Sequence, residues 1–95
     1  MTESNTIDVT AYPVVVFSSN YCGYCQAAKR LLHSKGVDWK EYQVDGQPET
    51  RQFMVDLVKK TSVPQIWIGG EHVGGCDELY ALDSAGELDQ KLSKL

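Results

Sequence analysis

The chain has 95 residues, the size of one domain, and its hydrophobic share of 42% is ordinary for a globular protein. Thirteen acidic residues against nine basic ones give a formal net charge of -4, which argues against nucleic acid as a partner. No apolar run is long enough to cross a bilayer, and residues 1–13 lack the basic and apolar regions of a secretory signal. We therefore expect a cytoplasmic protein with no membrane partner, in which a polar extension at 1–11 precedes a single domain at 12–95.

The first half of the chain predicts a strand, a helix and a second strand. Residues 13–17 (PVVVF) form a short apolar run rich in β-branched residues, typical of a strand that is buried on both faces. Residues 26–35 place apolar side chains on one helical face, and Gly36 follows as a stop signal. Residues 37–44 alternate in polarity, as a half-buried strand does. This spacing implies a right-handed crossover between two parallel strands.

The second half predicts a helix, a hairpin and terminal helices. Pro48 suits the first turn of the helix, whose expected inner face is Phe53, Met54, Leu57 and Val58. Residues 63–68 (VPQIWI) predict a third strand, which the Gly69-Gly70 turn joins to a short fourth strand at 71–73. Leucines at helical spacing follow, namely Leu79, Leu82, Leu88, Leu92 and Leu95. Because the hairpin adds antiparallel strands, we predict an α/β fold with a mixed sheet.

Cys22 and Cys25 are placed to act as a redox pair. Cys22 falls in the loop that leaves the first strand, and Cys25 falls in the first turn of the helix. Residues three apart share a helix face, so the two sulfurs can meet. The positive helix N-terminus favours a thiolate on Cys22, the more exposed of the two. A thiolate attacks disulfides, and Cys25 is placed to resolve the resulting mixed disulfide.

Two other uses of the cysteine pair fit the sequence less well than redox chemistry. A zinc site needs a second Cys/His pair, and the remaining candidates, His33, His72 and Cys76, form none. A structural disulfide is unusual in a cytosolic chain. A CxxC pair that follows a strand and opens a helix within a strand–helix–strand unit is typical of thioredoxin-like redox proteins. The sequence therefore predicts redox chemistry and no firm metal site.

Three segments together resemble the glutaredoxins: CGYC at 22–25, TSVPQIWIGG at 61–70 and GGCDEL at 74–79. The resemblance covers about residues 13–95 and is closest to the small bacterial dithiol members. It implies a thioredoxin fold with a four-stranded mixed sheet flanked by helices. It also implies a glutathione-disulfide oxidoreductase whose partners are glutathione, as co-substrate, and disulfide-containing or glutathionylated proteins. No resident cofactor is required for that activity.

The resemblance also implies where glutathione binds. A cis peptide bond between Val63 and Pro64 would present the Val63 backbone to the cysteinyl part of glutathione. The N–H groups of Cys76 and Asp77, at a helix N-terminus, would bind the γ-glutamyl carboxylate, and the Asp77 side chain would bind its ammonium. The alternative for Asp77 is a helix cap. Tyr24, between the two cysteines, would form a wall of the groove.

The sequence departs from the family pattern at two positions. Ser19 stands where a lysine often lies, three residues before the first cysteine, which removes one cation for the glycyl carboxylate of glutathione. Arg51 matches another family position that faces this carboxylate and can bind it in a bidentate manner, although a solvated helix charge is the alternative. Gly23 stands where dithiol members most often carry proline, and glycine loosens the first helical turn.

Two alternative functions follow from the same resemblance. Relatives that lack the proline can assemble a [2Fe–2S] cluster between two monomers, each supplying its first cysteine, here Cys22, together with two glutathiones. The chain would then be a cluster carrier or sensor, a dimer when the cluster is bound and otherwise a monomer. The second alternative is a redoxin reduced by thioredoxin reductase, but such relatives lack the GGCD turn present at 74–77.

Overall fold

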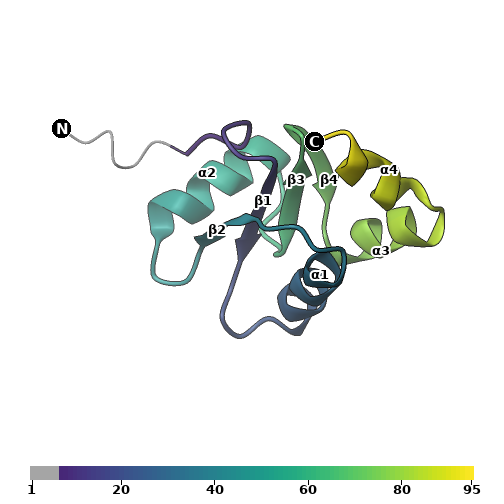
Figure 1. The fold of residues 1–95 in the computed structure, drawn as a ribbon. Coiled ribbons are helices and arrows are strands. Elements are labelled where there is room, and N and C mark those ends of the chain that lie inside the picture. Colours follow the sequence, from purple (N-terminus) through teal and green to yellow (C-terminus); the bar gives the residue numbers. More distant parts are fainter. Residues whose placement is uncertain (1–6) are drawn as a thin grey trace.

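A computed structural model of the chain describes residues 7–95, so the first part of the predicted extension, residues 1–6, lies outside the described residues. Four strands and four helices follow one another in the predicted order (Figure 1). Their bounds are β1 Val14–Ser18, α1 Gly23–Ser34, β2 Lys40–Gln43, α2 Pro48–Val58, β3 Gln65–Ile68, β4 Glu71–Gly74, α3 Cys76–Ser84 and α4 Glu87–Ser93.

The strands form one mixed sheet, as predicted. Their order is β2-β1-β3-β4, so β1 and β3 lie inside the sheet and β2 and β4 lie at its edges. β1 pairs in parallel with β2, across the crossover made by α1, and antiparallel with β3. β3 and β4 form the hairpin expected around Gly69-Gly70. Both the strand directions and the crossover that the sequence indicated are therefore present.

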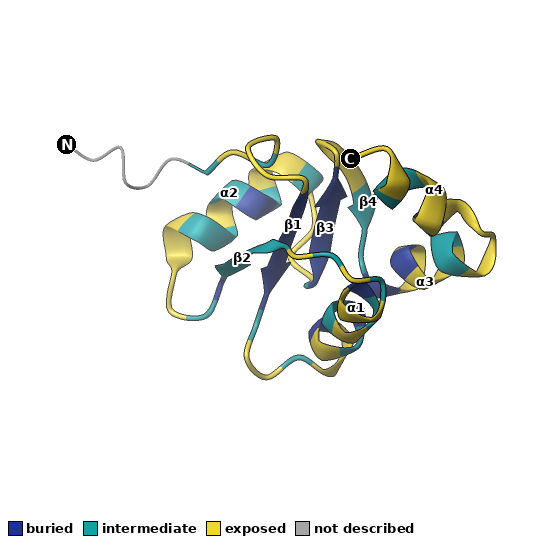
Figure 2. Cartoon of the chain, in the orientation of Figure 1, coloured by how far each residue is buried: buried dark blue, intermediate teal, exposed yellow. Residues whose placement is uncertain are grey.

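The core is built around β1, whose residues are all buried. Successive side chains of a strand point to opposite faces of the sheet. Val14 and Val16 pack in a cluster with α1, α3 and α4, whereas Val15 and Phe17 pack in a cluster with α2. The sheet is thus the middle of three layers, with α2 on one face and the other helices on the opposite face (Figures 1 and 2). Burial on both faces explains the unbroken apolar run of β1.

The inner face of α2 is narrower than the sequence indicated. Met54 is fully buried, and Phe53, Val55 and Val58 are partly buried against the α2 cluster, but Leu57 is 48% exposed. Within residues 7–95, α2 is the only helix on its face of the sheet, so no second helix covers the side that carries Leu57. The prediction that Leu57 belongs to the core is wrong.

Several predicted boundaries shift in the structure, and β3, for example, begins at Gln65 and not at Val63. α1 begins at Gly23, ahead of the amphipathic stretch at 26–35, and Cys22 serves as its N-cap residue. β2 is shorter than the alternating stretch at 37–44 and covers only Lys40–Gln43. The earlier start of α1 matters for function, because it places the whole CGYC segment in the cap and first turn of one helix.

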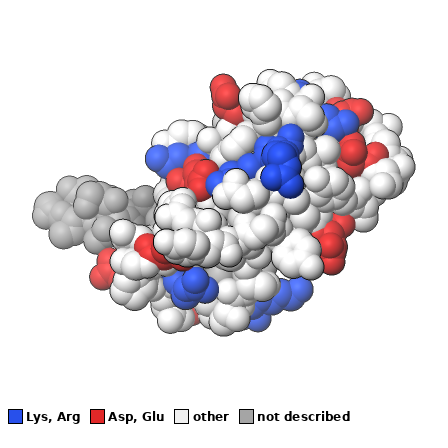
Figure 3. All heavy atoms as spheres, turned by 90° about the horizontal axis from the view of Figure 1, so that it is seen from below, with Lys and Arg blue, Asp and Glu red and all other residues white. Residues whose placement is uncertain are grey.

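The described surface carries charges of both signs. On the face shown in Figure 3, acidic and basic side chains are interspersed. No helix within residues 7–95 is long and apolar enough to cross a membrane. Near the N-terminus, Ile7 and Val9 pack against the cluster that contains α2, and the boundary between extension and domain at residue 12 stays a prediction.

The contrast between two leucines tests this core. Leu32→Ala removes a fully buried side chain of α1 and should lower the free energy of unfolding by about 2–5 kcal/mol. Leu57→Ala removes a half-exposed side chain of α2 and should cost less than about 1 kcal/mol. Urea denaturation followed by circular dichroism measures both values. Equal losses in the two variants would place Leu57 in the core after all.

Candidate active site

Cys22 occupies the N-cap position of α1, directly after the loop that leaves β1. Its Sγ accepts the Cys25 N–H at 3.1 Å, the bond that a capping oxygen makes in most helices. The Cys22 thiol also donates to the Val63 carbonyl oxygen at 3.5 Å. Cys22 is partly exposed, whereas Cys25 and Cys76 are buried. The sulfur that solvent and substrates can reach therefore lies at the positive end of a helix.

Cys25 is a shielded thiol. Its side chain is fully buried, and burial, followed by the hydrogen bond with Cys22, raises the pKa of Cys25 to about 12. Cys25 is therefore protonated at neutral pH and is not a nucleophile in that form. Burial also raises the pKa of the Cys76 thiol, with the nearby charge of Asp77 acting in the same direction. The site thus combines one accessible sulfur with two protonated ones.

Asp45, in the turn after β2, fixes the loop that carries Cys22. Its Oδ1 accepts the Ser19 hydroxyl at 2.7 Å, and its Oδ2 accepts the Asn20 N–H at 2.7 Å. Both bonds hold the pKa of Asp45 below its usual range, and the bond from Asn20 has the larger effect. Ser19 replaces the lysine of the family pattern, so this position anchors the loop to the end of β2 and supplies no charge.

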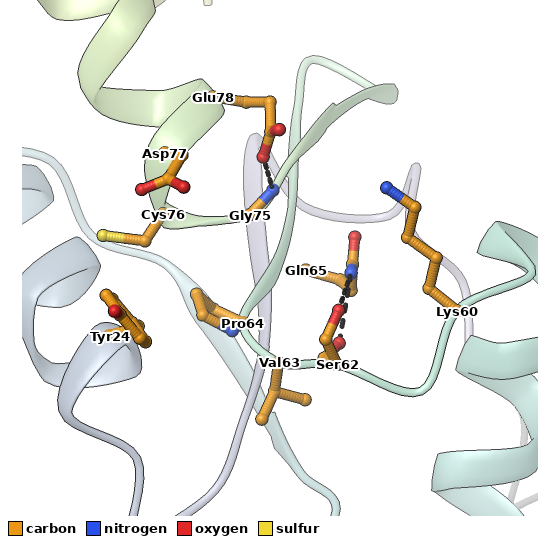
Figure 4. Close-up of a pocket in the computed structure, with 10 residues that line it drawn as sticks. All are labelled: Tyr24, Lys60, Ser62, Val63, Pro64, Gln65, Gly75, Cys76, Asp77 and Glu78. Carbon is orange, nitrogen blue, oxygen red and sulfur yellow. Dashed lines mark hydrogen bonds between the residues drawn. The ribbon is translucent and has the colours of Figure 1, made fainter.

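A groove of about 220 Å³ lies between the N-terminus of α1, the loop before β3 and the start of α3 (Figure 4). The Val63-Pro64 peptide bond is cis, as predicted, and both residues line the groove. In Figure 4, Tyr24, Cys76 and Asp77 lie on one side of Pro64, and Lys60 lies on the other. The remaining lining residues are Ser62, Gln65, Gly75 and Glu78.

The Gly74-Gly75 turn requires glycine at the first position and leaves little room for a side chain at the second. Gly74 has a φ of +120°, and a Cβ there would lie 2.9 Å from the Cγ of Glu78. A Cβ on Gly75 would lie 3.2 Å from the Pro64 carbonyl oxygen, so the turn approaches the cis proline closely. The Gly75 N–H donates to Glu78 Oε1 at 2.8 Å. Glu78 therefore caps α3, and the alternative role of Asp77 as the cap is wrong.

Asp77 is left free to face the groove. It is the second residue of α3, it is exposed, and it lines the groove next to Cys76. The N–H groups of Cys76 and Asp77 belong to the first turn of α3, where helix geometry supplies no acceptor. One wall of the groove thus offers backbone N–H donors and a carboxylate side by side. Such a pair suits a ligand group that carries both an anion and an ammonium.

The structure brings together five of the eight predicted site residues along the groove, namely Tyr24, Val63, Pro64, Cys76 and Asp77. Cys22 does not itself line the groove, but its thiol donates to the carbonyl oxygen of Val63, which does. Cys25 is fully buried and does not line the groove either. Arg51 is not among the lining residues, because its Nη1 donates to the Thr61 carbonyl oxygen at 3.1 Å.

Lys60 is the cation among the residues that line the groove, and it is not among the site residues predicted from the sequence. The signal that could have singled it out is its place four residues before Pro64, on the loop that leads into β3. Burial is the main cause that lowers the pKa of His72, and the positive charge of Lys60 lowers it further. The Gly75 hydrogen bond is the main cause that lowers the pKa of Glu78, and Lys60 again adds to it. Lys60 lies on the far side of Pro64 from Tyr24, Cys76 and Asp77 (Figure 4).

The fold and the paired cysteines define a thiol-disulfide oxidoreductase with a thioredoxin fold. The sequence model of the glutaredoxins matches residues 14–73, so the chain belongs to the glutaredoxin family. It is 53% identical over 81 residues to a glutaredoxin of Pseudomonas aeruginosa, covering 85% of this chain and 96% of that protein. It is 47% identical over 79 residues to glutaredoxin 3 of Escherichia coli K12, covering 83% and 95%.

A solved structure confirms the fold. The crystal structure of a buckwheat glutaredoxin–glutathione complex superposes with a TM-score of 0.84 and 31% sequence identity, covering 90% of this chain and 81% of that one. The predicted four-stranded thioredoxin fold is therefore correct. The similar structure shares the fold described above, with its sheet and helix layers, over nearly the whole domain.

The described residues contain no group of three or more His, Cys, Asp or Glu side chains that could hold a metal ion. Of the three thiols, only Cys22 is not buried, so one copy of the chain offers one accessible sulfur ligand. An iron–sulfur cluster needs four thiolates. One copy of the chain therefore offers too few accessible thiolates to hold such a cluster by itself.

The difference in burial between the thiols predicts selective alkylation. Iodoacetamide at neutral pH should label reduced protein at Cys22 and leave Cys25 and Cys76 largely unlabelled, because burial raises the pKa of both. A raised thiol pKa means that the reactive thiolate of Cys25 appears only as the pH approaches about 12. Peptide mass spectrometry measures the labelling, and unfolding in urea should expose all three. Labelling of Cys25 in folded protein as fast as Cys22 would contradict this account.

Proposed function

We propose that this protein is a glutathione-dependent oxidoreductase that reduces protein disulfides and protein–glutathione mixed disulfides through Cys22 and Cys25. The observation that carries the proposal is the groove, which joins the accessible sulfur of Cys22 to a wall with N–H donors, a carboxylate and a nearby lysine. A cytoplasmic location, where glutathione keeps thiols reduced, is part of the same proposal.

The wall at the start of α3 suits the γ-glutamyl group. That group carries a carboxylate and an ammonium on the same carbon. The first N–H groups of α3 favour the carboxylate, and the exposed Asp77 side chain favours the ammonium. The similar buckwheat glutaredoxin was crystallised as a complex with glutathione, which supports the same ligand here.

The other end of glutathione carries the glycyl carboxylate and needs a cation. Lys60 lines the groove, whereas the Arg51 guanidinium lies on the Thr61 carbonyl. We therefore assign the countercharge for this carboxylate to Lys60 and place Arg51 in the supporting structure. The cysteinyl part would then lie between these two ends, along Val63 and Pro64 and within reach of Cys22.

The chemistry proceeds by two exchanges of sulfur partners. The Cys22 thiolate attacks the glutathione sulfur of a mixed disulfide, forms a bond to it and releases the protein thiolate, which takes up a proton. A thiolate from a second glutathione then attacks the bound glutathione sulfur, which yields oxidised glutathione and restores Cys22. Each turnover on a mixed disulfide thus consumes one glutathione thiol, because half of the oxidised glutathione comes from the substrate. On protein disulfides, Cys25 instead attacks Cys22 and releases the reduced protein, and two glutathione thiols then reduce the resulting Cys22–Cys25 disulfide.

Two further candidates use the same sulfur. A cluster shared by two chains would ligate Cys22 of each, and charge-transfer absorbance in protein purified without oxygen is the observation that would favour it. If thioredoxin reductase reduced the protein, the γ-glutamyl site proposed at the start of α3 would have no use. A coupled assay with each reductant separates this candidate from the glutathione-dependent one, because glutathione with glutathione reductase should support the faster turnover.

The assignment of the two cysteines predicts unequal variants. Cys22→Ser should abolish activity on every substrate, because no other thiol is accessible. Cys25→Ser should retain turnover on glutathionylated substrates, which need one thiolate, and lose most activity on protein disulfides. A glutathione-reductase-coupled assay with both substrate types measures this. The reverse pattern, with Cys25→Ser inactive and Cys22→Ser active on glutathionylated substrates, would overturn the assignment.

The role of Asp77 predicts a selective loss of glutathione use. Asp77→Ala should lower kcat/KM for glutathione by about tenfold, the low end of the effect of one hydrogen bond to a charged group, because Asp77 is exposed. Alkylation of Cys22 by iodoacetamide should change little, since Asp77 would contact only the ammonium. Steady-state kinetics and alkylation rates measure the two effects.

Glu78→Ala is the matched control for helix stability. It removes the carboxylate that accepts the Gly75 N–H, so its melting temperature should fall further than that of Asp77→Ala, which loses only a favourable charge in the first turn of α3. A fall in melting temperature for Asp77→Ala equal to that for Glu78→Ala, or an unchanged kcat/KM for glutathione, would leave Asp77 without a binding role.

A further inference from the structure

The buried thiol of Cys25 has to lose a proton before it can react. Resolution of a mixed disulfide requires the Cys25 thiolate, and the surroundings of Cys25 oppose that charge through burial and the neighbouring Cys22 sulfur. Two influences act in the opposite direction, a hydrogen bond from the Ser19 backbone and the positive charge of Lys29. The Ser19 backbone is neutral, so Lys29 is the one full charge that favours the thiolate.

Lys29 lies one helical turn beyond Cys25 on α1. Residues four apart lie on the same side of a helix, so the lysine and the thiol are neighbours. The Lys29 side chain is only 16% exposed, and its Nζ lies 3.0 Å from Oε2 of Glu41 on β2. Lysine side chains usually extend into water. Here the ammonium is held under the active-site helix, between α1 and the parallel edge strand.

Glu41 is itself fixed by donors from several elements. Ser18, fully buried at the end of β1, donates its hydroxyl to Oε2, and Gln43 Nε2 donates to the same oxygen at 3.2 Å. Trp39 Nε1 donates to Oε1 at 3.4 Å. Although burial raises the pKa of Glu41, the bonds from Ser18 and Lys29 lower it overall, so the carboxylate stays ionised. The ammonium of Lys29 therefore has a rigid, charged anchor.

Such an arrangement is poorly explained by stability alone. Taking two charges out of water costs about as much as their attraction returns, so a partly buried pair adds little net stability. α1 already has a second lysine pair at its other end, where Lys35 contacts Asp83 at 2.7 Å and Asp89 at 3.0 Å. The Lys29–Glu41 pair lies next to the redox cysteines, whereas the ion pairs of Lys35 lie at the far end of α1.

We propose that Lys29, anchored by Glu41, is a positioning residue for the resolving step, in which its ammonium stabilises the Cys25 thiolate that attacks the mixed disulfide on Cys22. The inference rests on the proposed function of the cysteine pair. The groups that bear on Cys25 are Cys22 and Lys29 of α1, with Glu41 of β2 facing Lys29 and Cys76 of α3 facing Cys22.

The step balances without any further reactant. Cys25 releases its proton to water, and its thiolate attacks Cys22 Sγ. The bond between Cys22 and the substrate sulfur breaks, and the substrate leaves as a thiolate. The two cysteines end as a disulfide, so they are oxidised while the substrate sulfur is reduced. The mixed disulfide itself is the oxidant.

The aromatic disulfide dithiobis(nitrobenzoate) separates this step from glutathione binding. Mixed with reduced protein in a stopped-flow instrument, it should release one coloured thiolate when Cys22 attacks and a second when Cys25 displaces the bound group. Loss of the Lys29 charge should raise the pKa of Cys25 and so lower its thiolate fraction. For each tenfold loss of thiolate, the greater nucleophilicity of the more basic thiolate returns about threefold. The second phase should therefore slow in Lys29→Gln, by about threefold for each tenfold loss of thiolate.

Three comparisons distinguish charge from structure. Lys29→Arg keeps the charge and should keep most of the rate of the second phase. Lys35→Gln removes a similarly shielded lysine and its ion pairs from the C-cap of the same helix, and its second phase should match that of the unchanged protein. In a Cys22→Ser background, the Cys25 Cβ chemical shift, followed against pH by NMR, should titrate at higher pH after Lys29→Gln.

The outcomes decide the inference separately from the proposed function. An unchanged second phase in Lys29→Gln, an equal slowing in Lys29→Arg or Lys35→Gln, or an unmoved Cys25 titration would overturn the role of Lys29. Failure of the unchanged protein to release a second thiolate at all would instead contradict the proposed role of Cys25. A slowed second phase with a raised Cys25 titration, restored by arginine, supports the inference.

Discussion

The active site depends on the burial of one strand. β1 is covered on both faces, by α2 on one side and by α1, α3 and α4 on the other, so its end is fixed in space. The loop that leaves this end reaches the α1 N-terminus within a few residues. Asp45, in the turn after the neighbouring strand β2, holds this loop by hydrogen bonds from Ser19 and Asn20. The position of Cys22 is therefore set by the core of the protein and not by the loop alone.

Around that point, two helix N-termini and one proline loop meet. α1 presents Cys22, α3 presents its first N–H groups with Asp77, and the Val63 carbonyl lies against the Cys22 thiol. The Gly74-Gly75 turn permits this meeting, since any side chain there would collide with Glu78 or crowd the Pro64 carbonyl. The redox and binding parts of the site come from distant parts of the sequence and share one groove.

Much of this could be predicted from the sequence because its signals are local. The apolar run of β1, the glycine turns and the CxxC spacing each follow from a few neighbouring residues. The errors concern quantities that depend on tertiary contacts. Leu57 fits the helical period but is about half exposed on α2. The role of Arg51 in binding stays a prediction, and tertiary contacts alone show that its guanidinium donates to the Thr61 carbonyl.

The same limit explains what the sequence hid about charges. Asp77 and Glu78 are adjacent carboxylates, and only the turn geometry shows that Glu78 is the cap. Lys29 and Glu41 are twelve residues apart and come together because β2 pairs in parallel with β1. Local sequence patterns do not report a pairing of this kind.

The groove is made from the ends of packed elements, and this has a consequence for how it handles its ligand. The Glu78 bond fixes the turn before α3, Asp45 fixes the loop before α1, and Pro64 is buried between them. Little of the protein has to become ordered when a ligand arrives, so the entropy lost on binding falls mainly on the flexible ligand. For the glutathione proposed above, the groove of about 220 Å³ is therefore already formed before the ligand arrives. A preformed groove suits a ligand that would be consumed in every cycle and would have to be replaced.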